Sequence, residues 1–103
     1  MTLSNSDREF MQDGAKKAAV LLRAIGNENR LLVLCLLIEH GEMSVGALLE
    51  NIPLSQSALS QHLAKMREEG LISYRRESQT LYYRIENQNV ETIVATLKTI
   101  FCP

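Results

Sequence analysis

The sequence predicts a mainly helical winged helix-turn-helix domain with one small β-hairpin. Two observations lead to this prediction. Two short helical segments, 45–51 and 55–70, are separated by only a few residues, which is typical of a helix-turn-helix. The segment 71–85 follows directly, with β-branched and aromatic residues on both sides of a polar tip, as in a β-hairpin. A hairpin that follows a helix-turn-helix is a wing.

The bulk composition is that of one ordinary globular domain. The chain has 103 residues, of which 46% are apolar and 22% charged, with a net charge of −1. This net charge does not indicate nucleic-acid binding, so that function has to be argued from local charge. Between Ser55 and Ile85 five cations stand against three acids, whereas acids accumulate in the N-terminal half. This asymmetry gives mild support for a nucleic-acid partner.

The chain shows no sign of a membrane or secreted protein. No apolar run approaches the length that spans a bilayer, and the N-terminus lacks the apolar core of a signal peptide. We therefore expect a cytoplasmic protein without a membrane partner. In that compartment two cysteines are reduced, catalytic or sensory more often than they form a structural disulfide. We expect residues 1–8 to be flexible and 9–103 to form the single domain.

Helical spacing and capping residues predict the first two helices. Apolar residues recur at helical spacing from Phe10 to Ile25, and Gly26 ends this segment. Asn27 is suited to cap a second helix. Its apolar run 31–38 contains a cysteine, and periodicity alone does not separate a buried helix from a strand there. The cap, the leucine content and the length to Gly41 favour a central helix.

The next two segments form the predicted helix-turn-helix. Ser44 is suited to cap the short helix 45–51, and Pro53 with Leu54 makes a tight turn. The helix of Ser55–Gly70 opens with a capping serine and closes with glycine, the residue that most easily becomes left-handed after a helix. Its buried stripe is predicted to be Leu59, Leu63 and Met66.

The opposite face of this helix carries hydroxyls and amides followed by cations. We expect it to contact DNA through Ser55, Gln56, Ser57, Ser60, Gln61, His62, Lys65 and Arg67. Glutamine can pair with the major-groove edge of adenine, serine is less selective, and Lys65 and Arg67 suit phosphates. Most such faces are only solvated, but the cap, turn and wing around this one favour DNA. For His62, a packing or capping role is an equal alternative.

The polar tip of the hairpin offers further contacts. Arg75, Arg76 and Gln79 are either solvent-exposed side chains or contacts to the minor groove or the phosphate backbone. We expect the second, because a wing tip commonly lies against DNA.

A final helix, capped by Asn87 or Asn89, is expected to complete the fold. The first and last helices carry more apolar residues than a small three-helix core with a wing can cover. A homodimer through these two helices is the expected use of that surface. Such a dimer presents two recognition helices, which can enter successive major grooves about 34 Å apart.

These segments resemble the ArsR/SmtB family of winged-helix bacterial repressors. The resemblance rests on Asn27–Arg30 with the leucine run after it, on Leu54–Leu63 with Gly70–Ile72, and on Arg75–Tyr83. It covers roughly residues 18–103, and the combined pattern is specific although each piece alone is weak. It implies a transcriptional regulator that binds double-stranded operator DNA.

The chain departs from the metal-sensing members of that family. Their third-helix site needs cysteines where this chain has 44–48, and their last-helix site needs Asp and His where it has 90–96. A zinc site wants about four ligands, whereas the two histidines and two cysteines here are scattered. We therefore expect no metal site.

Two cysteines, Cys35 and Cys102, instead match the dithiol subgroup typified by HlyU, BigR and YgaV. That resemblance implies a sensor of persulfides and polysulfides, in which the reduced form binds DNA and a sulfur chain between the cysteines weakens binding. Taken alone, Cys35 is more often a small core residue with blunted reactivity. Cys102, near the C-terminus, is expected to be accessible.

Other functions remain as alternatives at this point. A regulator of the same family could respond to haem, peroxide or a metal held by the two cysteines, although no cofactor is required by the sequence. A winged helix can also bind protein and never touch DNA, which the near-zero net charge allows. An enzyme is not expected, because the chain has no Gly-rich phosphate loop, nucleophile elbow, Cys-x-x-Cys or cluster of carboxylates and histidines.

Overall fold

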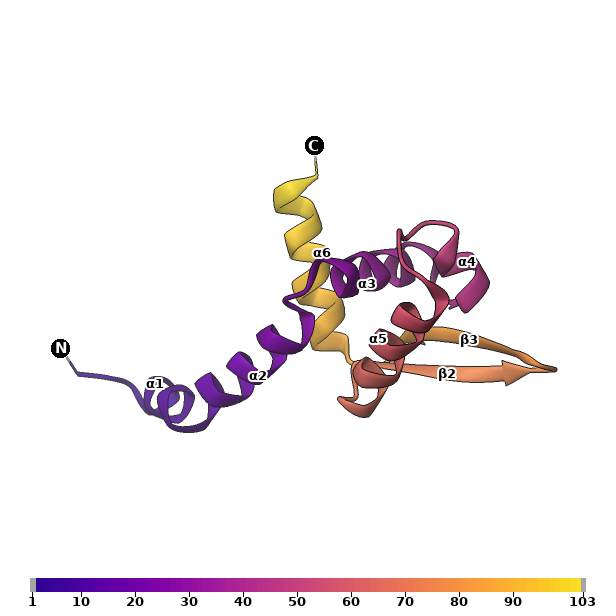
Figure 1. The fold of residues 1–103 in the computed structure, drawn as a ribbon. Coiled ribbons are helices and arrows are strands. Elements are labelled where there is room, and N and C mark those ends of the chain that lie inside the picture. Colours follow the sequence, from indigo (N-terminus) through magenta and orange to yellow (C-terminus); the bar gives the residue numbers. More distant parts are fainter. Residues whose placement is uncertain (1, 103) are drawn as a thin grey trace.

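The computed structural model describes residues 2–102 and has the predicted winged helix-turn-helix fold (Figure 1). Helices α4 and α5 form the helix-turn-helix, and strands β2 and β3 form the long hairpin of the wing. The elements in chain order are α1 (Asn5–Glu9), a π-helical turn η1 (Phe10–Gly14), α2 (Ala15–Ile25), α3 (Glu28–His40), β1 (Met43–Ser44), α4 (Val45–Leu49), α5 (Gln56–Glu68), β2 (Ile72–Glu77), β3 (Thr80–Ile85) and α6 (Gln88–Phe101).

The core forms where α3, α5, α6 and the base of the sheet meet. Helix α3 is the central helix, since it packs against α6, β1 and β3. The predicted stripe of α5 is confirmed, because Leu59, Leu63 and Met66 are at most 1% exposed. Burying a side chain of this size stabilises the fold by about 1.5–3 kcal/mol. The buried stripe therefore fixes which face of α5 remains in solvent.

The predicted helix caps are also confirmed. A side-chain oxygen accepts a hydrogen bond from an amide of the first turn at each of the four capping residues Asn27, Ser44, Ser55 and Asn87. At the other ends, Gly41 after α3 and Gly70 after α5 have φ angles of 82° and 77°. These left-handed conformations favour glycine, so the two residues end their helices where the sequence predicts.

The N-terminal segment contains a short helix that the sequence analysis did not predict. Helix α1 begins after Ser4, which forms a capping box with Asp7. The Ser4 hydroxyl oxygen accepts from the Asp7 amide at 3.1 Å, and the Asp7 carboxylate accepts from the Ser4 amide at 3.4 Å. The helix expected to run unbroken from Phe10 is interrupted by η1, and π-helical turns are a known cause of helix kinks.

The wing has three strands, where the sequence predicted a two-stranded hairpin. Strand order is β1-β3-β2, all antiparallel, and Met43 and Ser44 of β1 pair with Tyr83 and Tyr82 of β3. The predicted polar tip is also shorter, since pairing continues to Glu77 and only residues 78–79 form the turn. Arg75 and Arg76 therefore lie within a strand and not at the tip.

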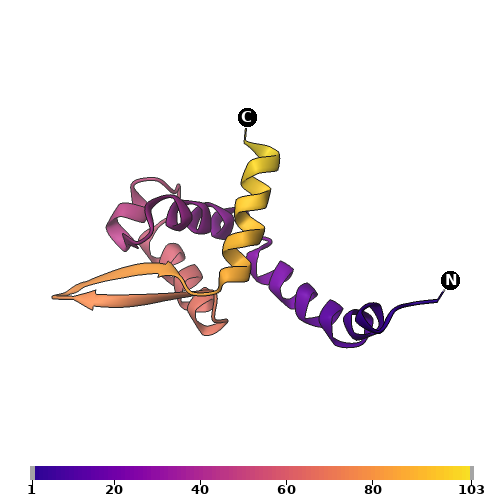
Figure 2. The same ribbon diagram turned by 180° about the vertical axis from the view of Figure 1, so that it is seen from behind.

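The N-terminal arm, α1 to α2, projects from the rest of the molecule (Figures 1 and 2). The molecule measures 56 × 32 × 21 Å and has a radius of gyration of 15.8 Å. A compact domain of this length has a radius of about 13 Å. Only the end of the arm is packed against the body of its own chain, where Ala24 and Ile25 of α2 are buried in the core. Within residues 2–102, no helix has the length and apolar character needed to cross a membrane.

Candidate nucleic-acid interface and thiol pair

The exposed face of α5 keeps most of the predicted DNA contacts together. Because Leu59, Leu63 and Met66 point into the core, the polar residues between them point outward. The residues exposed on this face are Gln56, Ser57, Ser60, Gln61 and Lys65. Their contact with DNA stays a prediction, but they form one continuous donor and acceptor surface on a rigid element.

Ser55 has a capping role. Its Oγ accepts a hydrogen bond from the Ala58 amide at 3.2 Å and lies 3.4 Å from the Ser57 hydroxyl. The hydroxyl is therefore already engaged in holding the first turn of α5. Substituting such a cap with alanine typically costs about 0.5–2 kcal/mol of stability. This residue positions the start of the recognition helix whether or not it also contacts DNA.

His62 is half-buried and bonded within the protein, which corresponds to the packing alternative. Its Nδ1 accepts a hydrogen bond from Arg30 Nε at 3.2 Å. Because Nδ1 is the acceptor, the neutral imidazole carries its proton on Nε2. On its Nδ1 side His62 thus links α5 to the first turn of α3, and a phosphate contact by the rest of the ring stays a prediction.

Arg30 joins three elements. Besides His62 on α5, it donates from a terminal nitrogen to the carbonyl oxygen of Ala24, in the last turn of α2, at 2.9 Å. The same nitrogen lies 3.9 Å from a carboxylate oxygen of Glu69. Its side chain is only 17% exposed, so these contacts satisfy a largely buried charge. Arg30 thereby connects α2 of the N-terminal arm, the central helix α3 and the recognition helix α5.

Arg67 makes a contact within the protein that the sequence did not indicate, and its phosphate contact stays a prediction. Its guanidinium lies over the ring of Tyr74 on β2, 4.9 Å from the ring centroid. Tyr74 in turn packs against Tyr83 of β3, with ring centroids 5.5 Å apart. A cation over an aromatic face is attracted by the ring quadrupole. Arg67 therefore ties the end of α5 to the wing, so one face of its guanidinium is occupied.

The two wing arginines are in different environments. Arg75 is held by the carboxylates of Glu42 and Glu77, at 2.6 Å and 2.7 Å. The hydrogen bond from Arg75 lowers the pKa of Glu42 below its ordinary value, and the two carboxylates raise the pKa of Arg75. Within residues 2–102, Arg76 has no such ion pair and is exposed, as is Gln79. The structure thus separates Arg75 from the rest of the predicted set.

Sequence reasoning overlooked Arg30, Tyr74 and Glu42 as parts of this region. Arg30 had a detectable signal, since it directly precedes the apolar run 31–38 and charges are rarely buried without partners. The roles of Tyr74 and Glu42 depend on contacts between distant segments. No local pattern in the chain indicates them.

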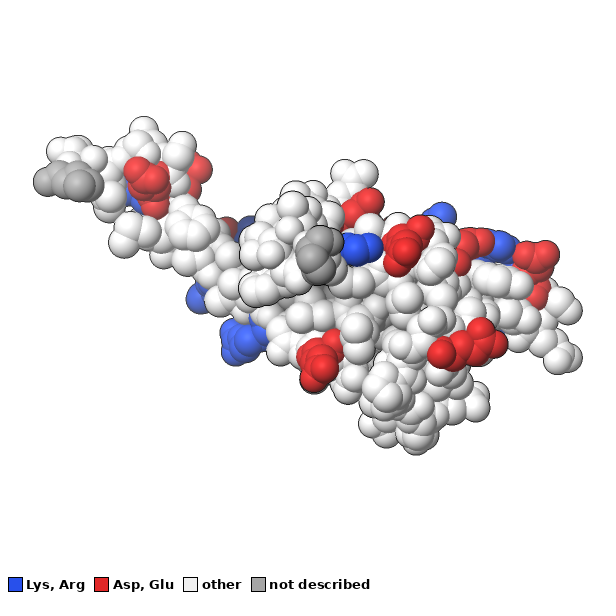
Figure 3. All heavy atoms as spheres, turned by 90° about the horizontal axis from the view of Figure 1, so that it is seen from above, with Lys and Arg blue, Asp and Glu red and all other residues white. Residues whose placement is uncertain are grey.

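Charge is mixed on the side of the molecule where α6 ends. Figure 3 shows acidic and basic groups interspersed there, with acidic groups gathered on the projecting arm and uncharged areas around them. No concentrated positive surface occupies this face. DNA contact is accordingly argued from the exposed faces of α5 and the wing.

The two cysteines lie on helices that pack against each other. Cys35 is half-buried in the middle of α3, and Cys102 is exposed directly after α6, where its amide donates to the Lys98 carbonyl at 2.8 Å. Burial raises the pKa of the Cys35 thiol, the nearby Lys98 ammonium opposes this, and Cys102 and Glu39 add to the increase. Among residues 2–102 no group of three potential metal ligands occurs.

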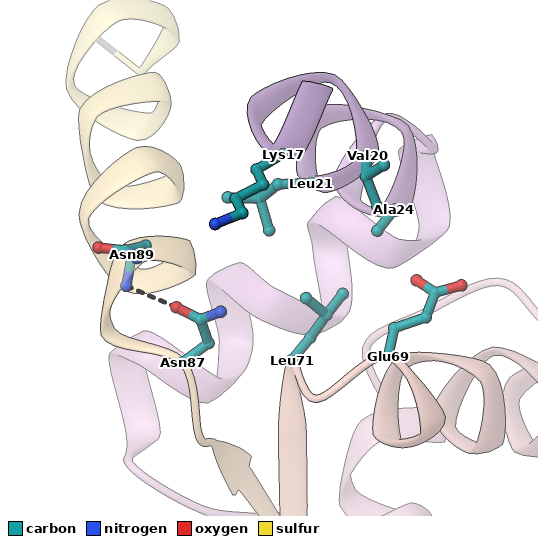
Figure 4. A pocket seen from close by; sticks show the side chains of 8 residues that line it. All are labelled: Lys17, Val20, Leu21, Ala24, Glu69, Leu71, Asn87 and Asn89. Atoms are coloured by element: carbon teal, nitrogen blue, oxygen red, sulfur yellow. Dashed lines mark hydrogen bonds between the residues drawn. The ribbon is translucent and has the colours of Figure 1, made fainter. Parts of the chain in front are cut away.

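A cavity of about 270 Å³ lies between α2, the end of α5 and the start of α6 (Figure 4). Its apolar wall includes Val20 and Leu21 of α2 and Leu71 after α5, while Asn87 and Asn89 border it from α6. Asn87 itself is occupied as a cap, since its side-chain oxygen accepts from the Asn89 amide at 2.8 Å. The cavity therefore exposes an apolar side of the arm, and Lys17 and Glu69 add charged groups to its lining.

Comparison with known proteins gives one consistent family. Residues 27–74 match the model described as "Bacterial regulatory protein, arsR family". The chain is 47% identical to the HTH-type transcriptional regulator YgaV of Escherichia coli K12, over 90% of this chain and 94% of that protein. Among solved structures, reduced HlyU from Vibrio cholerae superimposes with a TM-score of 0.86 at 43% identity, covering 92% of this chain and 99% of that one. The transcriptional repressor BigR from Xylella fastidiosa gives 0.84 at 38% identity, covering 100% and 99%. The chain therefore belongs to the arsR family and is a non-enzymatic, DNA-binding transcriptional regulator with a winged helix-turn-helix fold.

Proposed function

We propose that this chain is a homodimeric regulator that senses reactive sulfur species through Cys35 and Cys102. In the proposed mechanism the reduced form binds operator DNA, and a sulfur chain that links the two cysteines of a protomer weakens this binding. The observation that carries the proposal is that an exposed thiol follows α6 and a half-buried thiol lies on α3, two helices that pack against each other. The structural description of a similar protein, HlyU, as reduced accords with it.

The proposed chemistry consists of two displacements at sulfur. The Cys102 thiolate attacks a sulfur atom of an inorganic polysulfide and displaces a shorter polysulfide anion, which leaves a sulfur chain on Cys102. The Cys35 thiolate then attacks that chain and displaces its terminal part as hydrosulfide or polysulfide. The two thiols lose two electrons and their protons pass to solvent, while the cleaved S–S bonds of the polysulfide accept the electrons.

Exposure supports this order of attack. Cys102 is reachable from solvent, whereas burial raises the pKa of Cys35 and lowers its share of reactive thiolate. Lys98 partly offsets the burial, because its cation favours the thiolate of Cys35. The Lys98 ammonium also lies 3.8 Å from the Glu39 carboxylate, so this pair spans the contact between α6 and α3. Cys35 is thus suited to close the bridge as the second step.

The apolar arm supports the proposed homodimer. Phe10 and Met11 of η1 are 57% and 65% exposed, and Ile100 and Phe101 at the end of α6 are 64% and 78% exposed. Contiguous exposed apolar surface marks an interaction site in a soluble protein. The arm projects from the body in Figures 1 and 2, and the cavity of Figure 4 leaves a further apolar wall uncovered. A second copy would cover these surfaces in a two-fold arrangement.

The dimer explains how two distant cysteines would affect DNA binding. Two recognition helices bind well only when their separation matches one turn of DNA, about 34 Å. A sulfur chain between Cys35 and Cys102 would change how α6, a dimer helix, lies against α3. Because Arg30 of α3 is hydrogen-bonded to His62 of α5, a movement of α3 would also move the recognition helix. Release of DNA would follow from the altered spacing.

Intact mass spectrometry tests the chemistry. The reduced protein is treated with sodium tetrasulfide and then with a thiol-alkylating reagent. We expect a species that is heavier by added sulfur and has no alkylated cysteine. The variants Cys35→Ser and Cys102→Ser serve as matched controls, which should retain open chains or mixed products and no internal bridge. A mass increased only by two alkyl groups, with no added sulfur, would contradict the proposal.

A DNA-binding assay distinguishes polysulfide from the other candidate inducers. Polysulfide, haem, hydrogen peroxide and Zn²⁺ are each titrated against reduced protein bound to one labelled promoter fragment. The proposal predicts that polysulfide weakens binding at the lowest dose and that loss of either cysteine abolishes the effect. A response to haem or Zn²⁺ alone would assign the regulator a different inducer. Failure to bind any duplex at low salt would favour a protein partner.

A further inference from the structure

We propose that Arg75 is a positioning residue that braces the wing, and that Arg76 is the wing arginine which contacts the DNA backbone. The two residues are adjacent in sequence and carry the same charge, so sequence alone assigns them the same role. The inference requires DNA binding and is independent of the sulfur chemistry.

Strand alternation places the two side chains on opposite faces of the sheet. Arg75 is paired with Tyr82 of β3, and Ser44 of β1 is paired with the same tyrosine, so these residues share one face. Arg76 is paired with Leu81 and shares the other face with Tyr74. Tyr74 is the residue on which Arg67 of α5 lies. Arg76 is thus on the recognition-helix side of the wing.

The Arg75 side chain crosses the middle strand. Its guanidinium lies 4.6 Å from the centre of the Tyr82 ring and continues beyond it to Glu42, just before β1. Arg75 Nε donates to the two carboxylate oxygens of Glu42 at 3.0 and 3.1 Å, and a terminal nitrogen donates to one of them at 2.6 Å. Two-point pairing of this kind fixes direction as well as distance. This Arg75–Glu42 pair, called the brace below, therefore connects β2 to the corner between α3 and β1.

The charge around Arg75 does not attract phosphate. Glu42 and Glu77 both bind it, and Arg84 is close enough to contribute to the lowered pKa of Glu42. Two cations and two acids make this cluster neutral as a whole. Arg75 would have to leave both carboxylates and the Tyr82 ring to reach DNA. Arg76 is exposed and, within residues 2–102, has no competing acid.

The two roles predict opposite effects for a change at Glu42. Fluorescence anisotropy would be measured with a labelled duplex from the region upstream of the gene, over a series of salt concentrations, for Arg75→Lys, Glu42→Gln and Arg76→Gln. A brace predicts that Arg75→Lys and Glu42→Gln each weaken binding by about two- to fivefold, the range open to a surface ion pair. The slope of log K against log salt should stay unchanged in both, because no phosphate contact is lost. Arg76→Gln should make the slope shallower by about 1.8, since each phosphate contributes about 0.9 and the dimer has two copies.

A phosphate contact by Arg75 predicts the reverse. Lysine still binds phosphate, so Arg75→Lys would keep both affinity and slope. Glu42→Gln would free the arginine, remove a repelling charge and strengthen binding. Either result overturns the inference. The double variant Glu42→Gln/Arg75→Lys supplies a second test, because two residues of the same ion pair should together cost no more than either change alone. Additive losses would also overturn it.

Discussion

Arg30 offers the sharpest test of how the recognition helix is held. We expect Arg30→Met to lower the free energy of unfolding by about 2–4 kcal/mol, because two hydrogen bonds from a charged donor are lost. These are the bonds to the Ala24 carbonyl at 2.9 Å and to His62 Nδ1 at 3.2 Å. Methionine keeps most of the apolar stem, so packing should change little. The Glu69 contact at 3.9 Å adds little, as expected for a partly exposed pair.

The assay is urea denaturation followed by circular dichroism. Protomer concentration has to be equal for all variants, because the stability of a dimer depends on it. Arg23→Met is the matched control, since Arg23 lies in the last turn of α2 and is exposed. That control should fall within about 0.5 kcal/mol of the parent protein, as surface changes usually do. An equally small effect of Arg30→Met would refute the linking role of Arg30.

Three further predictions concern the two functional regions. Ser55→Ala should lower the free energy of unfolding by about 0.5–2 kcal/mol in the same assay, because the cap on the Ala58 amide is lost. The control Ser57→Ala removes no helix cap and should leave the free energy of unfolding unchanged. Gln61→Ala should weaken operator binding by about 1–3 kcal/mol and relax sequence preference, and unchanged preference in competition with random DNA would exclude base contact. The rate at which the sulfur bridge closes should rise steadily from pH 7 to pH 9, because burial raises the pKa of Cys35 and its thiolate accumulates only as pH rises. Rapid quenching and mass spectrometry measure this rate. A rate that is flat with pH would show that Cys35 is not the slow nucleophile.

Local features of the fold follow directly from the sequence. The four caps and the two left-handed glycines sit where predicted, because each depends on a few neighbouring residues. The buried stripe of α5 follows from helical spacing alone. The capping box of Ser4 was missed although its pattern is local, because the polar N-terminus was taken as flexible.

The roles of single charged residues depend on contacts that the sequence does not contain. The bond between Arg30 and His62 joins residues 32 apart, and that between Arg75 and Glu42 joins residues 33 apart. Neither partner can be chosen before the fold is known. The wing strands were predicted too short for a different reason. Arg75, Arg76 and Glu77 are polar, and a polar sequence indicates exposure, whereas strand pairing can continue through exposed residues.

The effect of sulfur bridging on DNA affinity tests the central claim most directly. Fluorescence anisotropy on the upstream promoter fragment would compare reduced, tetrasulfide-treated and re-reduced protein with Cys102→Ser treated in the same way. We expect the dissociation constant of the parent protein to rise by about 5–150-fold, the usual range of allosteric coupling, and to recover on reduction. The Cys102→Ser variant should bind with one affinity throughout. Equal affinity of the reduced and bridged parent protein would contradict the proposed function.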